Sequence, residues 1–337
     1  MRVLLVGASS FVGAYEVEEL LKHDKYTGGG VVATGRNPKF KDYYKSIDVP
    51  YENVDVCNPD TFKKLDQYQF DAVVLFAALM PANVPKENDI DDTGDYFDVN
   101  VIGTLNLLEY CRKHNINRLI SFGSRFDCRL YNQDMVITEE TPLNFSFTDD
   151  HAAYVMSNKA KYDVMRYYNE KYNMKNIFFR LPTIFGVGPH GGFCKDGVYR
   201  KSGLQIFMDK AKAGESIEVY GDTNTQKDLL YVKDLAVAVK NALESKEARG
   251  FYNIGYDKNF KLIDIARTII DVFSPAGRRS ELIQKPDIPN NGGFPLMDTT
   301  KLKKEIGFTP VFGDIHSIIE DYKMELDRGL YTNLFGV

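Results

Sequence analysis

Small residues near the start of the chain have the types and spacing of a phosphate-binding loop. An apolar run at residues 3–6 is typical of a buried strand, and an amphipathic helix is expected from about residue 12 to residue 22. Small side chains between them let a pyrophosphate approach the backbone, where N–H groups at the helix start can donate to it, aided by the helix dipole. The residues expected to contact the cofactor here are Gly7, Ser9, Ser10, Phe11, Val12 and Gly13.

Ser10 occupies the middle position of this loop, where the usual Gly-x-x-Gly-x-x-Gly form has glycine. A tight turn that binds no ligand is therefore the alternative interpretation. The loop comes as early as Gly7, and a series of strands and helices follows it. Both features favour dinucleotide binding.

The position that usually selects between NAD and NADP holds a basic residue. An NAD site commonly has a carboxylate about twenty residues after the glycine loop, on the ribose 2′-hydroxyl. Between Glu19 and Asp42 the one acidic residue is Asp24, which belongs to the end of the first helix, and Arg36 stands at the expected place. A guanidinium suits a 2′-phosphate. We expect NADP rather than NAD, with a solvated turn residue as the alternative role of Arg36.

Strand-like and helix-like stretches alternate through the first half of the chain. This pattern predicts an α/β fold with a doubly wound parallel sheet, of the Rossmann type, whose ligands lie at the carboxyl ends of the strands. We expect Asp55 and Val56 at the adenine edge, and Ala77 and Ala78 close to the dinucleotide, although two alanines also suit packing. The expected strands are 2–6, 30–34, 51–54, 72–76, 117–122 and 177–181, and the helices include 95–114 and 152–172.

Composition narrows the class of protein. The 337 residues are 44% hydrophobic and 26% charged with a net charge of −5, which is typical of a globular protein and argues against nucleic acid as the main partner. The longest uncharged apolar run, residues 72–80, is too short to cross a membrane. Four cysteines and five histidines lack the spacing of metal ligands, so we expect no metal. Without a signal-peptide pattern at the start, a cytoplasmic location is expected.

Several segments together resemble one family, the extended short-chain dehydrogenase/reductases of the epimerase/dehydratase type, which act largely on nucleotide-linked sugars. The matching segments are 7–13, 77–78, 100–109, 179–186, 227–234, 251–255 and 298–310. The resemblance implies a dinucleotide domain at 1–182 plus 226–256 and a smaller α/β substrate lobe at 183–225 plus 257–337. It also implies cofactor contacts at Asn100 and Leu181, and a homodimer formed through the helices at 100–114 and 152–172.

The resemblance implies a catalytic serine and a Tyr-x-x-x-Lys pair. Ser124 and Tyr154 match, and a lysine four residues after the tyrosine would share its helix face and lower the phenol pKa. Asn158 stands at that place instead, and Lys159 follows it, displaced by about 100° on a regular helix. Three interpretations follow. In the first, Asn158 substitutes for the lysine; in the second, a π-bulge returns Lys159 to the site; in the third, the redox chemistry is impaired. All three interpretations stay open.

On the substrate side, the resemblance implies contacts from Thr183 and Lys227, where the family usually has Asn and Arg, and from Met80 and Arg125. The expected function is an NAD(P)-dependent nucleotide-sugar 4-epimerase or 4-ketoreductase. A 4,6-dehydratase is disfavoured, because Arg125 and Phe126 replace that group's Asp-Glu pair. The alternatives are a dinucleotide-binding sensor or scaffold without catalysis, and an NADP-dependent reductase of a non-nucleotide carbonyl compound.

Overall fold

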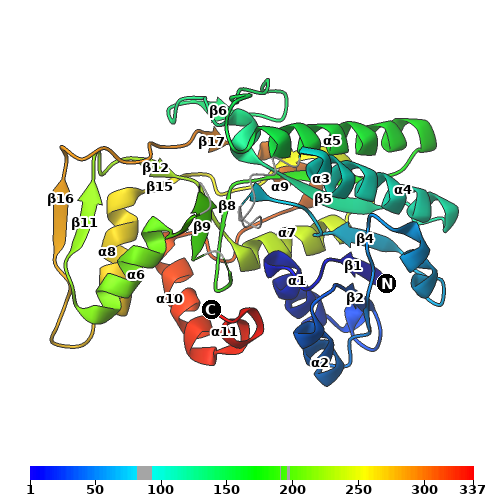
Figure 1. The fold of residues 1–337 in the computed structure, drawn as a ribbon, viewed down its shortest axis with the longest axis horizontal. Coiled ribbons are helices and arrows are strands. Elements are labelled where there is room, and N and C mark those ends of the chain that lie inside the picture. The colour runs from blue at the N-terminus through cyan, green and yellow to red at the C-terminus, as the bar shows by residue number, and fades with distance from the viewer. Residues whose placement is uncertain (82–92, 190, 196–197) are drawn as a thin grey trace.

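A parallel seven-stranded sheet with helices on both faces forms the centre of the computed structural model (Figure 1). The structure describes residues 1–81, 93–189, 191–195 and 198–337. The strands of the sheet are β1 (Val3–Val6), β2 (Val31–Thr34), β3 (Tyr51–Glu52), β4 (Ala72–Leu75), β5 (Leu119–Ser124), β7 (Ile177–Leu181) and β14 (Gly250–Asn253). Their spatial order is β14-β7-β5-β4-β1-β2-β3, and every neighbouring pair is parallel. The predicted doubly wound α/β fold is confirmed.

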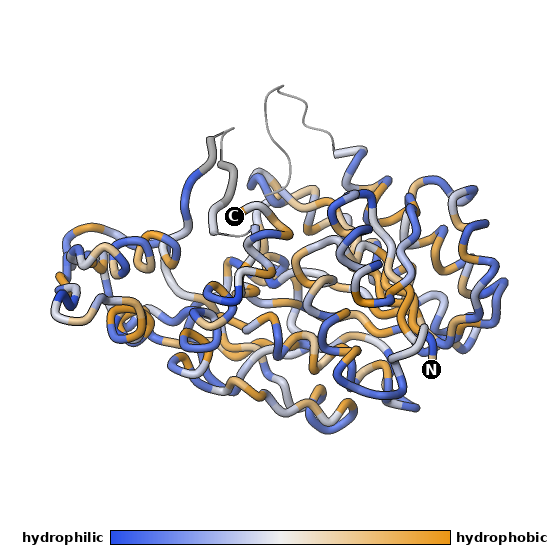
Figure 2. Tube along the Cα trace, turned by 90° about the horizontal axis from the view of Figure 1, so that it is seen from below, coloured by the Kyte–Doolittle hydropathy of each residue, from blue (hydrophilic) through white to orange (hydrophobic). Residues whose placement is uncertain are grey.

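The strands are buried on both faces, because successive side chains point to opposite layers of helices. Val3 and Leu5 belong to a core with one layer, whereas Leu4 and Val6 belong to the other. Hydrophobic residues, coloured orange, are gathered in the interior of this part of the chain (Figure 2). The helices around the sheet are α1 (Phe11–Leu21), α2 (Pro38–Ser46), α3 (Thr93–Phe97), α4 (Gly103–Lys113), α5 (Ala152–Tyr172), α7 (Val232–Glu244) and α9 (Thr300–Ile306).

The predicted helix at 95–114 is not a single regular α-helix. A π-helical turn at Asp98–Ile102 separates α3 from α4. Such turns shift the residues after them around the helix and occur frequently at functional sites. By contrast, the second predicted helix, α5, has the predicted bounds and is α-helical throughout.

The second half of the chain adds shorter elements beside the sheet. A parallel pair, β8 with β13, follows the carboxyl end of β7, and β11 pairs with β16 at the far end of the molecule (Figure 1). The division into two domains at the expected boundaries stays a prediction. The remaining strands and helices are β6 (Val136–Ile137), β8 (Thr183–Phe185), β9 (Gly192–Lys195), β10 (Val198–Lys201), α6 (Gly203–Ala213), β11 (Ile217–Tyr220), β12 (Gln226–Lys227), β13 (Leu229–Tyr231), β15 (Phe260–Lys261), α8 (Leu262–Phe273), β16 (Leu282–Lys285), β17 (Leu296–Met297), α10 (Ile315–Arg328) and α11 (Leu330–Phe335).

A lysine lies in the interface between α5 and the sheet. Lys161 is 2% exposed, and its Nζ donates a hydrogen bond of 2.6 Å to the carbonyl of Phe122 in β5. Burial lowers the pKa of the Lys161 amine to about 7. The helix therefore carries a group that is charged in water but largely neutral above pH 7 in the folded protein.

Replacing this lysine should change how stability depends on pH. Below pH 7 both folded and unfolded chains protonate Lys161, and folding must bury the charge. Between about pH 7 and pH 10 the unfolded chain binds a proton that the folded chain lacks, so stability rises with pH. Lys161→Met removes this dependence and should stabilise the protein by roughly 2 to 3 kcal/mol more near pH 6 than near pH 9. Urea unfolding at both pH values measures the difference.

Lys171→Met, at an exposed position of the same helix, is the control and should show no such pH dependence. A stability difference between Lys161→Met and the wild-type protein that is equal at both pH values would contradict the shifted pKa.

Candidate active site

The glycine loop between β1 and α1 is held by close backbone contacts. Gly7 has a left-handed φ of 85°, and a Cβ there would lie 2.6 Å from the backbone N of Ala77. A Cβ on Gly13 would lie 2.7 Å from the Cα of Ala8. Ser10 caps α1 by accepting a 3.2 Å hydrogen bond from the Gly13 N–H, a role that the missing middle glycine could not perform. The residues present fit a pyrophosphate, because a loop of small residues runs directly into the N-terminus of α1, where backbone N–H groups can donate to an anion.

The remaining side chains of this loop have different surroundings. Phe11 is 4% exposed and belongs to the core, so only its backbone faces the loop. Val12 is half-buried. Ser9 lies beside the end of β2, where a Cβ on Gly35 would meet its Oγ at 2.3 Å. No side chain fits at Gly35, and Arg36, the next residue, is exposed.

The segments after β3 and β4 lie close to the α4 side of the sheet. The Asp55 carboxylate accepts a 3.0 Å hydrogen bond from the Cys57 N–H. Val56 is buried against α4, where a Cβ on Gly103 would lie 2.7 Å from its Cγ2. Ala77 meets the glycine loop, as described above, and Ala78 is half-buried.

Asn100, in the π-helical turn, joins the segment after β4 to α5. Its Oδ1 accepts from the Leu79 N–H at 2.9 Å, while its Nδ2 donates to the Leu79 carbonyl at 3.1 Å and to the Ser157 Oγ at 3.0 Å. The side chain is 1% exposed. Any contribution of Asn100 to cofactor binding thus acts through the position of Leu79.

Tyr154 and Asn158 form a buried pair at the start of α5. Burial raises the pKa of Tyr154 to about 12, and a hydrogen bond from the Asn158 side chain opposes that rise. The Asn158 Nδ2 also donates to the Tyr154 carbonyl at 3.0 Å, while its Oδ1 is buried and has no hydrogen-bond partner among the described residues. A Cβ on Gly123 would lie 3.7 Å from the Asn158 Cβ. The pair therefore lies beside the carboxyl end of β5, where Ser124 follows Gly123.

Ser124 ends β5 and pairs in register with Leu181 of β7. Its Oγ accepts a 3.3 Å hydrogen bond from the Phe126 N–H and thereby caps the short 3₁₀ turn Arg125–Cys128. The hydroxyl hydrogen can still be donated to a further oxygen.

Lys159 does not join this group. It is exposed, and its Nζ is paired with Asp163 one helical turn further along. No π-bulge occurs in α5 to rotate it inward. Of the two residues considered for the lysine position, the structure brings Asn158 to Tyr154.

Lys161 was not singled out from the sequence. The available signal was its spacing, because residues 154, 158 and 161 are separated by four and three and so share one helix face. A lysine is usually exposed because it is charged, so the sequence pattern did not indicate that Lys161 is buried. Its contact with Phe122 in the structure shows the burial.

The expected substrate residues lie mostly in one cluster. Arg125 forms an ion pair of 2.6 Å with Asp228 and donates a 2.9 Å hydrogen bond to the Thr183 Oγ1. Its guanidinium also lies 3.4 Å from the centre of the Phe294 ring. The Lys227 ammonium donates a hydrogen bond to the carbonyl of Gly292 and lies 5.7 Å from the centre of the same Phe294 ring. The fourth expected residue, Met80, is half-buried five residues after β4.

Asp228 and Phe294 are not among the site residues expected from the sequence. The position of Asp228 directly after Lys227 could have indicated that it belongs to the site. Nothing in the local pattern indicated the second, because Phe294 lies far along the chain from Arg125.

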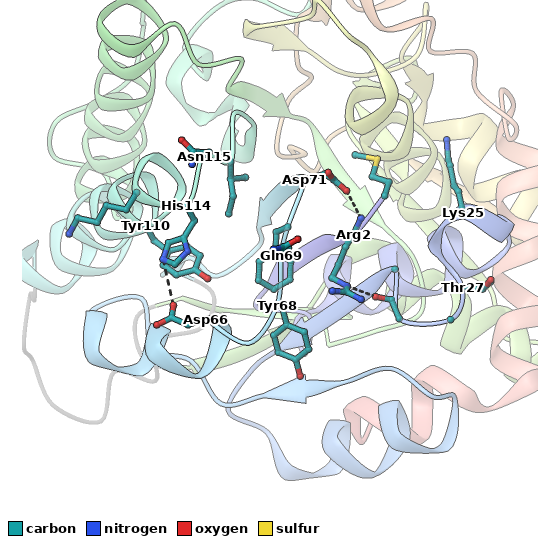
Figure 3. Close-up of a pocket in the computed structure, with 17 residues that line it drawn as sticks. Arg2, Lys25, Thr27, Asp66, Tyr68, Gln69, Asp71, Tyr110, His114 and Asn115 are labelled. Atoms are coloured by element: carbon teal, nitrogen blue, oxygen red, sulfur yellow. Dashed lines mark hydrogen bonds and ion pairs between the residues drawn. The ribbon is translucent and has the colours of Figure 1, made fainter.

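A surface pocket of about 850 Å³ lies away from this site (Figure 3). Its lining includes Arg2, Asp71 and Ile116, which precede β1, β4 and β5, so it opens at the amino-terminal edge of the sheet. Over the described ranges, no group of three or more His, Cys, Asp or Glu side chains is arranged to hold a metal ion. Within the same part of the chain, every helix is too short or too polar to span a membrane.

Comparison with known proteins finds relatives that match most of the chain. The chain is 26% identical over 321 residues to a putative UDP-glucose 4-epimerase of Methanocaldococcus jannaschii, covering 91% of this chain and 93% of that protein. It is 23% identical to a dTDP-glucose 4,6-dehydratase of Salmonella typhimurium, covering 92% and 89%. The crystal structure of dTDP-glucose 4,6-dehydratase from Bacillus anthracis in complex with NAD has the same fold, with a TM-score of 0.74, 18% identity and 99% coverage of both chains.

The sequence model of the NAD dependent epimerase/dehydratase family matches residues 3–255. This match covers more than half of the chain and includes the glycine loop, Ser124 and Tyr154. The chain therefore belongs to the NAD-dependent epimerase/dehydratase family.

Proposed function

We propose that the protein is an NAD(P)-dependent nucleotide-sugar 4-epimerase or 4-ketoreductase, in which Tyr154 exchanges a proton with a hydroxyl of the sugar. The observation that carries the proposal is the buried pair of Tyr154 and Asn158 beside the end of β5, where Ser124 lies. The glycine loop occupies the same edge of the sheet. Relatives named UDP-glucose 4-epimerase and dTDP-glucose 4,6-dehydratase support a nucleotide-linked sugar as the substrate.

In this proposal each protein residue has a distinct role. The glycine loop binds the pyrophosphate, Ser124 orients the reacting oxygen, and Tyr154 moves the proton. When bound, the nicotinamide supplies the hydride donor or acceptor. With its pKa raised to about 12, the Tyr154 phenol stays protonated at neutral pH, so it is a good proton donor and a poor base. This protonation state favours the direction in which a carbonyl becomes an alcohol.

A second candidate function is dinucleotide binding without turnover. Asn158 is the observation that favours it, because an amide carries no charge with which to lower the phenol pKa. The variants below distinguish the two candidates.

We further propose that NADP is preferred to NAD. The lack of space for a side chain at Gly35 supports this preference, because an acidic residue there would meet Ser9 and Tyr51. The exposed Arg36 follows directly and suits a 2′-phosphate.

A homodimer through α4 and α5 is also proposed. Its support is the exposure of apolar side chains in this region, with Ile102 45% and Tyr167 54% exposed.

Removing the Tyr154 hydroxyl tests the proposed chemistry. Tyr154→Phe should lower kcat by at least about a hundredfold, since a positioned acid or base contributes roughly 10² to 10⁴. Dinucleotide affinity should change less than about twofold, because the glycine loop is untouched. Chromatographic detection of the epimerised or reduced sugar formed from UDP- and dTDP-linked sugars measures the rate. Tyr68→Phe, in the pocket at the amino-terminal edge of the sheet, is the control. Retained turnover in Tyr154→Phe would refute the assignment.

Changing the charge beside Tyr154 tests the role of Asn158. Asn158→Lys should lower the phenol pKa by about 1 to 3 units, whereas Asn158→Asp should raise it. In the oxidising direction, where Tyr154 must lose its proton, the rate of Asn158→Lys should then rise at a lower pH than in the wild-type enzyme. The pH profile of kcat/KM measures this shift. Identical profiles for both variants would mean that Asn158 does not act on Tyr154.

Cofactor choice is tested at Arg36. Arg36→Ala should weaken NADPH binding about tenfold or more, because a charged hydrogen bond to the 2′-phosphate is lost, and leave NADH binding within about twofold. Titration of cofactor fluorescence measures both affinities, and Lys39→Ala, at the exposed start of α2, is the control. Equal affinities of the wild-type protein for NADPH and NADH would contradict the NADP proposal.

A further inference from the structure

Arg125 is a buried cation with an unused donor. The side chain is 11% exposed, and its Nε and Nη2 are occupied by Asp228 and Thr183. The Nη1 is buried and has no hydrogen-bond partner within the described part of the chain. An unpaired buried guanidinium nitrogen is unfavourable, so its retention is best explained by an acceptor that arrives with a ligand.

The charges around Arg125 do not balance. Among the described residues Asp228 is the one carboxylate paired with it. Burial lowers the pKa of the Lys227 ammonium, and the nearby charge of Arg125 lowers it further, so the two cations lie close to each other. Arg125 and Lys227 both lie against the ring of Phe294, at 3.4 Å and 5.7 Å from its centre. Arg125, Lys227 and Asp228 together therefore carry one more positive than negative charge, and the Arg125–Asp228 pair is buried. A ligand anion would neutralise this excess.

We propose that Arg125, with Lys227, binds an acidic group on the sugar of the substrate, such as a uronic-acid carboxylate. The inference rests on the proposed function, because it takes the reacting hydroxyl to lie at Ser124. Arg125 follows Ser124 directly, so its anionic partner belongs to the part of the substrate next to the reacting carbon. A carboxylate accepts from guanidinium and ammonium groups together, and it makes the shorter, stronger bonds of a charged pair.

The diphosphate of the nucleotide is the other source of anionic oxygen, and the two sources differ in what they predict. If the sugar carboxylate is the ligand, Arg125 distinguishes sugars that carry the same nucleotide. If the diphosphate is the ligand, Arg125 affects UDP itself as strongly as it affects a UDP-sugar.

Calorimetric titration of the cofactor-loaded protein with UDP-glucuronate, UDP-glucose and UDP tests the proposal. The wild-type protein should bind UDP-glucuronate at least about tenfold more tightly than UDP-glucose. Arg125→Gln should reduce that preference to about twofold or less and leave UDP affinity unchanged. Arg267→Gln, at an exposed position of α8, should keep the preference.

Arg125→Gln leaves Asp228 buried without its partner, so the double variant Arg125→Gln/Asp228→Asn provides a second measurement. It should fold and show the same loss of preference. Equal affinities of the wild-type protein for the two sugars, no binding of any of the three probes, or an equal loss of UDP affinity in Arg125→Gln would overturn the proposal. Failure of the proposed function gives a different result, namely preferred binding of UDP-glucuronate with no epimerised or reduced product from any sugar.

Discussion

The packing of α5 against the sheet is the constraint on which the candidate site depends. Met165 and Tyr168 of this helix belong to the same core as Leu119 and Phe178 of the strands beneath, and this core holds the helix in a single orientation. The start of α5 is thereby brought over the carboxyl end of β5. Any polar residue on the inner face of the helix must then lie in a space with little water, whatever its own preference.

The low polarity of that space determines the protonation of the groups within it. Burial favours the neutral forms of both the Tyr154 phenol and the Lys161 amine, one by raising its pKa and the other by lowering it. Positive charge accumulates elsewhere, around Arg125 and Lys227, where Asp228 compensates only part of it. The site thus separates a neutral proton donor from a cationic surface, an arrangement suited to an anionic substrate.

Close backbone approach made part of this site predictable. At positions 7 and 13 neighbouring backbone atoms leave no space for a Cβ, so only glycine fits. The spacing of these glycines is therefore visible in the sequence itself. The same holds for Ser10, whose type is suited to a helix N-cap. The π-helical turn around Asn100 was not predictable. The Asn100 side chain forms hydrogen bonds with the backbone of Leu79, which is distant in sequence, and no local pattern indicates such a contact.

The sequence by itself determined the order of strands and helices, the glycine loop and the family, since these depend on apolar periodicity and on motifs of neighbouring residues. It left three alternatives for the missing lysine, and the tertiary structure brought Asn158 rather than Lys159 to Tyr154. Only the tertiary structure placed Phe294 against Arg125. The physical reason is that burial and charge pairing arise between segments far apart in the chain, and no local pattern encodes which of them meet.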